Sequence, residues 1–119
     1  MNPRKKDPDC IFCKIAAGET DSKLVYRDDD VAIFSDINPA TPVHLLVVSR
    51  EHIPSLAEMS DEETPVIGKM VRAANRVARE QGIAESGYRI TINSGADAGQ
   101  IVQHVHMHLM GGRPLDWKH

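Results

Sequence analysis

The sequence predicts an α+β domain, in which an antiparallel sheet of five short strands packs with one long and one short helix. Segments with the alternating pattern of strands outnumber helical segments, and most of them are separated by links short enough for hairpins. A chain of 119 residues is long enough for a single hydrophobic core. We therefore expect one domain over residues 10–119, preceded by a flexible arm over residues 1–9.

The first half of the chain supplies the short helix and three of the strands. Apolar residues at helical spacing over residues 11–16 stop before Gly18, which indicates a short helix. Strand candidates at 24–27 and 31–35 are joined as a hairpin across three aspartates. The segment 43–49 is the most continuously apolar of the chain, and we expect it at the centre of the sheet.

The long helix is indicated by apolar residues at i, i+3 and i+4 between Val66 and Ala78. Two start signals compete for it. Ser60 with Glu63 resembles a capping box, and Thr64-Pro65 resembles an N-cap followed by proline at the first helical position. Gly82 is expected to end the helix, because glycine accepts the left-handed conformation found at many helix ends.

The two remaining strands are predicted at Tyr88–Asn93 and Val102–Met110, and the second carries three alternating histidines. His104, His106 and His108 are separated by apolar residues, so we expect the apolar residues in the core and three imidazoles in a row on the opposite face. Histidine changes its charge near neutral pH. Such a row indicates either acid–base and nucleophilic chemistry or a set of metal ligands, and a histidine-rich solvated face is the less favoured alternative.

The composition excludes several classes of function. The net charge is −3 with no basic stripe, so we expect no nucleic-acid partner. The polar start of the chain does not fit a signal peptide, and no later segment is long enough to span a membrane, so we expect a cytoplasmic protein without membrane contact. Both cysteines lie in one C-x-x-C motif, which in this compartment indicates a metal site or a redox pair before a structural disulfide.

Three further features are candidates for ligand binding. The loop 93–100 contains Gly95 and Gly99, whose backbone can approach an anion closely, although the same loop also fits an ordinary hairpin link. Asp36 follows a predicted strand and could hold ribose hydroxyls, or only stabilise a local turn. His44 starts the most apolar strand, and near the other histidines a functional role is about as plausible as a structural one.

A zinc site is predicted from Cys10, Cys13, His52 and His104, which together form a Cys₂His₂ ligand set. The two histidines are far apart in the sequence, so the fold has to bring them together. His44 could replace His52, but His52 is preferred because it leaves His44 free for the substrate. Two buried thiols or a redox pair are the alternatives.

These motifs resemble the histidine-triad (HIT) superfamily, and in detail its nucleotide-binding, purine nucleoside phosphoramidase branch. Residues 104–110 match the triad pattern, in which three histidines alternate with apolar residues. The segment from Phe34 to His44, the entry at Cys10–Ile15 and the closing Gly111-Gly112-Arg113-Pro114 match further signatures of the family. The resemblance extends over nearly the whole chain.

The resemblance implies a homodimer, in which two five-stranded sheets join into one, and hydrolysis of AMP- or GMP-linked phosphoramidates. It implies that His106 is the nucleophile and forms a nucleotidyl-histidine, and that His108 contacts the α-phosphate. His44 and His104 would belong to a supporting hydrogen-bond relay, and Asp36 would bind the ribose. The base pocket would be formed by Ile11, Phe12, Ile15, Phe34 and Ile37, and the phosphate would be surrounded by Asn93, Gly99, Gln100, Ile101 and Val102.

One departure from the family pattern, one question about His104 and three other functions remain open. Ile101 stands where some relatives have a hydroxyl residue, and if zinc takes His104, that residue is structural and leaves the relay. The first alternative function is a dinucleoside polyphosphate hydrolase. The second is a nucleotide-binding or scaffold protein with vestigial catalysis, which four histidines in place argue against. The third is a small zinc protein with all histidines as ligands, which would need a distorted strand.

Overall fold

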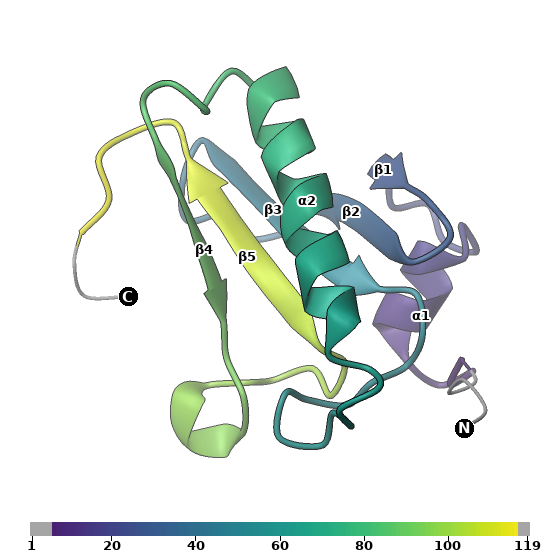
Figure 1. Cartoon of the computed structure of the whole chain (residues 1–119). Helices are drawn as coiled ribbons and strands as arrows, with labels where there is room; N and C mark the ends of the chain where they lie inside the picture. The colour runs from purple at the N-terminus through teal and green to yellow at the C-terminus, as the bar shows by residue number, and fades with distance from the viewer. Residues whose placement is uncertain (1–5, 117–119) are drawn as a thin grey trace.

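The computed structural model describes residues 6–116 and has the predicted α+β architecture (Figure 1). Residues 1–5 of the expected arm and the tail from Trp117 onward lie outside the described residues. The elements are α1 (Ile11–Ala16), β1 (Leu24–Arg27), β2 (Val31–Ser35), β3 (Val43–Ser49), α2 (Pro65–Glu80), β4 (Tyr88–Ile92), the short helix η1 (Ala96–Ala98) and β5 (His106–Gly111).

The five strands form one antiparallel sheet in the order β1-β2-β3-β5-β4. The apolar strand β3 is central, as its sequence predicts. Its register with β5 places Leu46 opposite His108 and His44 opposite Met110. The sheet therefore brings a strand from the first half of the chain beside its last strand at the centre, and β4 is left as an edge strand beside β5.

Helix α2 covers one face of the sheet in Figure 1. It begins with Pro65 at its first turn, as the second start signal predicts, but the Thr64 side chain makes no capping hydrogen bond. The first signal is used in the turn before the helix, where the Ser60 backbone N–H donates to Glu63 Oε1 at 2.9 Å. Gly82 follows the helix with φ of 76°, a conformation that favours glycine.

The two faces of the sheet belong to two separate apolar clusters. Alternate residues of the strands, among them Val47, Met107 and Leu109, pack against α2 and form the main core. The other residues of β2 and β3, among them Ala32, Phe34 and Leu46, pack against α1 on the opposite face. The even-numbered residues of β5, including His106 and His108, share this second face.

The last strand begins at His106, four residues later than the sequence predicts. Before it, residues 102–104 form a turn in which the His104 N–H donates to the Val102 carbonyl at 2.9 Å, and the Val105 N–H donates to the Ile53 carbonyl at 2.7 Å. The alternating pattern of Val102 and His104 is that of a strand, but contacts with a distant loop override it. His104 is therefore not part of the row formed by His106 and His108.

Among the helices of residues 6–116, none has both the length and the apolar composition needed to cross a bilayer.

Candidate active site

A cavity of about 670 Å³ opens on the sheet face opposite α2, between α1, β3, β5 and the loops that follow β2 and η1. Its volume is in the range typical of sites for small ligands. All the predicted nucleotide-binding residues except Gln100 line it, together with His106 and His108. Four further residues line it that the sequence does not single out, Ser22, Ser35, Asn38 and Leu46.

One end of the cavity is apolar and its mouth carries exposed apolar side chains. Phe12 and Phe34 pack edge to face with ring centroids 5.4 Å apart. Ile37 and Ile101 are each 89% exposed, which is unusual for large apolar side chains at the rim of a cavity. Such a slot fits a flat aromatic group of a ligand, which would cover apolar surface that water now contacts.

His106 presents a basic nitrogen because its other ring nitrogen is fixed by the backbone. Its Nδ1 lies 2.7 Å from the carbonyl oxygen of His104. A carbonyl only accepts, so Nδ1 carries the hydrogen and Nε2 keeps its lone pair. The Phe12 ring packs against the His106 ring at 5.1 Å and 85°. The side chain is thus held in one orientation and one tautomer, as a nucleophile requires.

His108 has the opposite tautomer, because a chain of hydrogen bonds reaches it from the backbone of Ala40. The Ala40 N–H donates to His44 Nδ1 at 3.0 Å, so a neutral His44 carries its hydrogen on Nε2. That nitrogen lies 2.9 Å from His108 Nδ1, which therefore accepts. His108 is left with Nε2–H as a donor, and it lines the cavity with His106, whose ring centroid lies 5.3 Å away.

Burial lowers the pKa of His108 below its usual 6.5, and the neighbouring His106 and His44 lower it further. Asp36 acts in the opposite direction and raises it. The balance keeps His108 neutral at pH 7, which agrees with the donor role that its hydrogen bonds give it.

Asp36 stabilises a local turn, which is one of the two roles that the sequence suggests, and it also contacts His44. Its Oδ1 accepts from the Asn38 N–H at 2.8 Å, which stabilises the turn after β2, and its Oδ2 lies 3.4 Å from His44 Nε2. The ligand atoms of Asp36, His44 and His108 are close enough to one another to hold a metal ion. Because the Ala40 N–H forces the hydrogen of His44 onto Nε2, we interpret this group as a hydrogen-bond relay.

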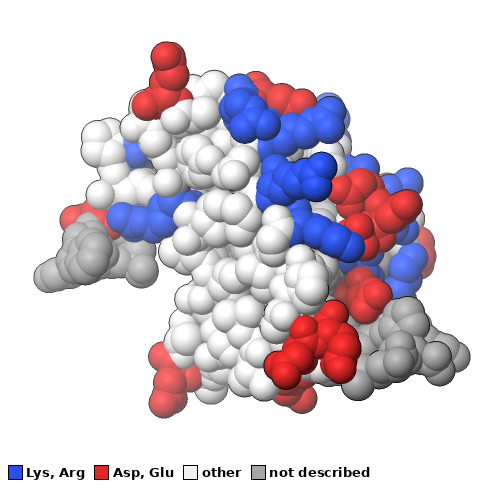
Figure 2. Space-filling view, in the orientation of Figure 1, with Lys and Arg blue, Asp and Glu red and all other residues white. Residues whose placement is uncertain are grey.

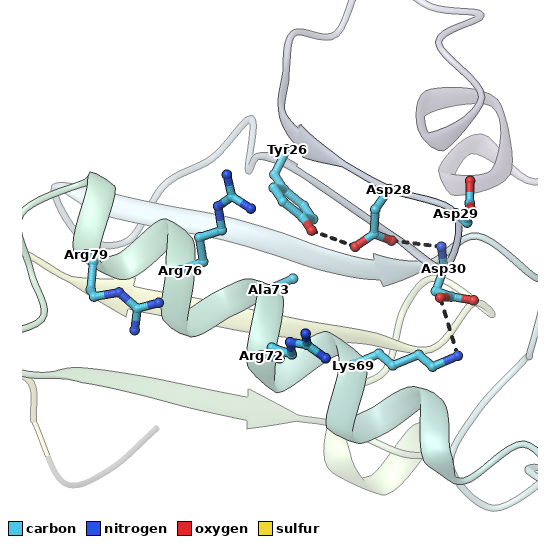
Figure 3. Close-up of a pocket in the computed structure, with 9 residues that line it drawn as sticks. All are labelled: Tyr26, Asp28, Asp29, Asp30, Lys69, Arg72, Ala73, Arg76 and Arg79. Carbon is cyan, nitrogen blue, oxygen red and sulfur yellow. Dashed lines mark hydrogen bonds and ion pairs between the residues drawn. The ribbon is translucent and has the colours of Figure 1, made fainter.

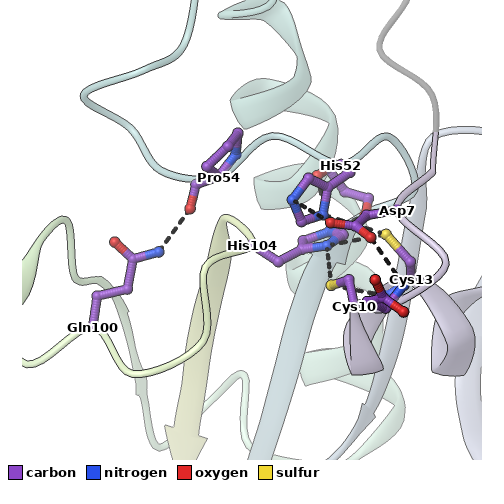
Figure 4. A network of polar contacts seen from close by, with 9 residues as sticks. Asp7, Cys10, Cys13, His52, Pro54, Gln100 and His104 are labelled. Atoms are coloured by element: carbon purple, nitrogen blue, oxygen red, sulfur yellow. Dashed lines mark hydrogen bonds and ion pairs between the residues drawn. The ribbon is translucent and has the colours of Figure 1, made fainter.

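Gln100 lies in the loop before β5, where its side chain holds the loop, and it is not among the residues that line the cavity. Its Nε2 donates to the Pro54 and Val102 carbonyls at 2.8 and 2.9 Å, and its Oε1 accepts from the Gly95 N–H at 2.9 Å. Figure 4 shows Gln100 turned toward Pro54. Its neighbours Gly99, Ile101 and Val102 do line the cavity.

The four predicted zinc ligands meet in one cluster beside the cavity (Figure 4). His104 Nδ1 lies 3.3 Å from Cys10 Sγ and 3.5 Å from Cys13 Sγ, and His52 Nδ1 lies 3.5 Å from Cys13 Sγ. In a tetrahedral zinc site a sulfur and a nitrogen ligand lie about 3.5 Å apart, given bond lengths of about 2.3 and 2.0 Å. The cluster therefore has the donor set and the spacing of a structural zinc site.

His104 is prepared for ligation by its second ring nitrogen. Its Nε2 lies 2.7 Å from the Ser49 carbonyl and must donate, so Nδ1 faces the sulfurs with its lone pair. Burial lowers the pKa of His104 to about 4, so the ring is neutral. Burial also raises the pKa of Cys13 to about 11, which keeps this thiol protonated unless a cation compensates the thiolate.

A second hollow, of about 420 Å³, lies on the other side of the molecule beside α2 (Figure 3). Lysine and arginine side chains gather over this part of α2 in Figure 2. Lys69 pairs across the hollow with Asp30, one of the aspartates after β1, at 3.3 Å, and Arg76 pairs with Glu80 of its own helix at 3.6 Å. Charges of both signs line this hollow, as on an ordinary solvated helix face.

Comparisons with known proteins agree with this geometry. The profile of the family described as "HIT domain" matches residues 17–115. The purine nucleoside phosphoramidase of Escherichia coli (strain K12) is 45% identical over 105 residues, which cover 88% of each chain. A solved structure of a histidine triad protein from Clostridium difficile is 43% identical, with a TM-score of 0.90, covering 92% of this chain and 96% of that one.

One similar structure is described with a metal. It is a Zn-bound histidine triad family protein from Mycobacterium smegmatis, 31% identical, with a TM-score of 0.76, covering 92% of this chain and 78% of that one.

Proposed function

Because this chain belongs to the HIT domain family, we propose that it is a hydrolase that cleaves the P–N bond of purine nucleoside phosphoramidates through a nucleotidyl intermediate on His106. The observation that carries this proposal is the 2.7 Å hydrogen bond from His106 Nδ1 to the His104 carbonyl. In the neutral ring, this bond leaves the lone pair of Nε2 free for nucleophilic attack and fixes the orientation of the ring.

The nucleotide is proposed to occupy the large cavity with its base in the apolar slot. Ile11, Phe12 and Phe34 would contact the base, and the Asp36 carboxylate would accept hydrogen bonds from the ribose hydroxyls. The phosphate would lie near Gly99, where the backbone can approach it closely because this residue has φ of 87°. The α-phosphorus then lies between this loop and the two cavity histidines.

The first chemical step is the attack of His106 Nε2 on the α-phosphorus. A P–N bond to the imidazole forms, and the P–N bond to the amine breaks. His108 Nε2–H donates to the phosphate oxygens and offsets the charge that develops on them. The amine leaves with a proton that His108 passes on from solvent. The His104 carbonyl stabilises the positively charged His106 ring by accepting a hydrogen bond from its Nδ1–H.

The second step is the attack of water on the nucleotidyl-histidine. A bond from the water oxygen to phosphorus forms, the Nε2–P bond breaks, and its electron pair returns to Nε2. The proton of the water is released to solvent, and the nucleoside monophosphate leaves. Dividing the hydrolysis into two displacements lets one histidine serve as nucleophile and then as leaving group.

The Cys₂His₂ cluster is proposed to hold a structural zinc ion. Cys10, Cys13, His52 and His104 would be its ligands, and a bound zinc would cross-link α1 to the loops before α2 and β5. In this proposal His104 is structural, and its contribution to catalysis is its backbone carbonyl. No disulfide joins the two cysteines, so both sulfurs are available as ligands.

A homodimer joined along β4 is also proposed. β4 is an edge strand whose five residues are all half-buried, and its Ile90 and Ile92 contact the core that α2 covers. Edge strands of this kind tend to pair. The opposite edge, β1, carries an irregularity in its register between Leu24 and Tyr26, which disfavours pairing there. Sedimentation measures the oligomeric state and so tests the proposed dimer. It is applied to the protein and to a Val71→Glu variant, which changes the adjacent flank of α2.

The activity is tested by mixing the protein with adenosine 5′-phosphoramidate and, separately, with diadenosine polyphosphate, and measuring AMP release. The proposal expects AMP from the phosphoramidate at a rate far above that from the polyphosphate. Faster cleavage of the polyphosphate would contradict the proposed activity and indicate a dinucleoside polyphosphate hydrolase. AMP binding without release from either compound would indicate a nucleotide-binding protein.

A further inference from the structure

The Cys10–Cys13 pair lies directly beside the proposed nucleophile and is connected to it by two routes. The first is the backbone of His104. Its ring contacts both sulfurs, and its carbonyl accepts the hydrogen bond that fixes His106. The second is Phe12, which lies between the two cysteines in the sequence and packs against the His106 ring.

In the reduced protein the thiols satisfy a buried histidine. His104 is fully buried, and its Nε2 already donates to the Ser49 carbonyl. Its Nδ1 can only accept, and the groups in contact with it are the sulfurs of Cys10 and Cys13, at 3.3 and 3.5 Å. A thiol S–H can donate to this nitrogen, and a disulfide has no hydrogen to donate.

Forming a disulfide would therefore leave His104 Nδ1 without a partner inside the protein, which is costly for a buried polar group. It would also draw the two sulfurs to about 2.05 Å, closer than any sulfur contact of the reduced cluster. The Cys13 N–H now donates to Cys10 Sγ at 3.5 Å at the start of α1, so the same turn would change. That turn carries Phe12 and the cavity residue Ile11.

Cys10 is the more accessible residue of the pair, because Cys13 is only 2% exposed. Cys10 is half-buried and lies at the surface end of α1. A hollow of about 190 Å³ reaches Cys13 between Asp7 and Lys14. A cluster that is closed to nucleotides is thus open to a molecule of the size of hydrogen peroxide.

We propose that Cys10 and Cys13 are an oxidation site, and that their disulfide inhibits catalysis by displacing His104 and Phe12 from the positions that hold His106. The inference rests on the proposed role of His106. One thiolate attacks a peroxide oxygen, the O–O bond breaks, and a sulfenic acid and hydroxide form. The thiol of the other cysteine attacks that sulfur, the S–O bond breaks, and the thiol proton leaves with the hydroxide as water. In total two thiols and one hydrogen peroxide give one disulfide and two water molecules.

The test compares three states of the same wild-type protein: zinc-loaded, metal-stripped and reduced, and peroxide-oxidised. Mass spectrometry verifies the loss of two hydrogens per chain. We expect turnover to fall tenfold or more in the oxidised state only, and to return with dithiothreitol. The chain has two cysteines, so an intramolecular effect that a thiol reverses has one possible source, whereas methionine oxidation is not reversed by dithiothreitol.

The matched control is Cys10→Ser, which cannot form the internal disulfide, so its turnover after peroxide should equal that of the same variant before peroxide. A second measurement needs no variant and no activity: ¹⁵N spectra of the histidines report which ring nitrogen of His106 carries the hydrogen. We expect Nδ1–H in both reduced states and exchange between tautomers in the oxidised one.

The inference is overturned if the chain with a verified disulfide turns over at the reduced rate and keeps Nδ1–H on His106. If instead the reduced protein shows no turnover at all, the proposed function fails. The ¹⁵N spectra then still decide whether the disulfide acts on His106.

Discussion

His104 and His106 are two residues apart, yet the backbone gives them opposite tautomers and thereby different chemistry. His106 donates from Nδ1 to the His104 carbonyl and presents Nε2 to the cavity, whereas His104 donates from Nε2 to the Ser49 carbonyl and presents Nδ1 to two sulfurs. Each ring has one nitrogen satisfied by a carbonyl and one left for chemistry. The role of a histidine in this segment is decided by which nitrogen the backbone occupies.

The two clusters also differ in how closed they are. The thiol cluster is completed by four side chains and has the character of a structural site. The cavity cluster is left open toward a space of about 670 Å³, and its relay through His44 ends at a donor on His108. The comparison predicts that substitutions in the cavity act mainly on turnover, whereas loss of zinc from the thiol cluster acts mainly on stability.

The largest effect is expected from His106→Ala. Removal of the nucleophile should lower turnover by at least about 10³-fold, while the affinity for AMP changes only by a small factor. Gln103→Ala, an exposed neighbour in the same segment, is the matched control and should keep full activity. Turnover that persists in a clean preparation of His106→Ala would refute the covalent mechanism.

The thiol cluster is tested by Cys10→Ser with Cys13→Ser, measured by zinc content, melting temperature and turnover. Loss of a bound zinc should lower stability by about 3 kcal/mol, or roughly 10 °C, with less than a threefold change in turnover. Metal-stripped wild type should melt close to the double variant. If the double variant still holds one zinc per chain, the proposed ligands are wrong.

Asp36→Asn should raise KM about tenfold, because the amide keeps the acceptor for the Asn38 N–H but loses the charge proposed to hold the ribose hydroxyls. Asp29→Asn is the control, since this exposed residue lies in the turn before β2 and lines the other hollow. Equal KM values for the two variants would remove Asp36 from the ribose site.

The pH profile tests the tautomer of His108. Its pKa lies below 6.5, so the neutral donor should persist from pH 7 down through 6.5, and kcat/KM should fall only at lower pH as the ring gains a proton. In Asp36→Asn this acid limb should move to still lower pH, because the carboxylate that raises the pKa is gone. An acid limb at or above pH 7 would contradict this assignment.

The smallest effect is expected from Ile101→Ser. Ile101 is 89% exposed at the rim of the cavity, so the change should leave the melting temperature unaltered. We expect it to change the ratio of kcat/KM between small and bulky amine leaving groups by less than tenfold. An unchanged ratio would place the leaving group away from Ile101.

Much of the fold follows from the sequence because its signals are local. The hairpin across residues 28–30 and the apolar run of β3 depend on neighbouring residues and appear where the pattern predicts. The start of β5 does not, because Val102 and His104 alternate as in a strand while the contact of Val105 with the Ile53 carbonyl turns the chain away.

The site is predicted less completely, for the same reason. Gln100 follows a glycine that lines the cavity, but hydrogen bonds to Pro54 and Gly95 turn its side chain away. The sequence contains a signal for Leu46 as a cavity residue, because Leu46 lies two residues after His44 on the same face of a strand. The tautomer of His104 cannot be predicted from the sequence, since it depends on the Ser49 carbonyl, 55 residues away in the chain.

The most direct test of the account is mass spectrometry of protein quenched within milliseconds after mixing with adenosine 5′-phosphoramidate, with peptide mapping of any adduct. The account predicts one adenylyl group per active site, bonded to His106, and none on His104 or His108. An adduct on either of those residues, or rapid AMP release without any adduct on His106, would contradict the assignment of the nucleophile by its backbone hydrogen bond.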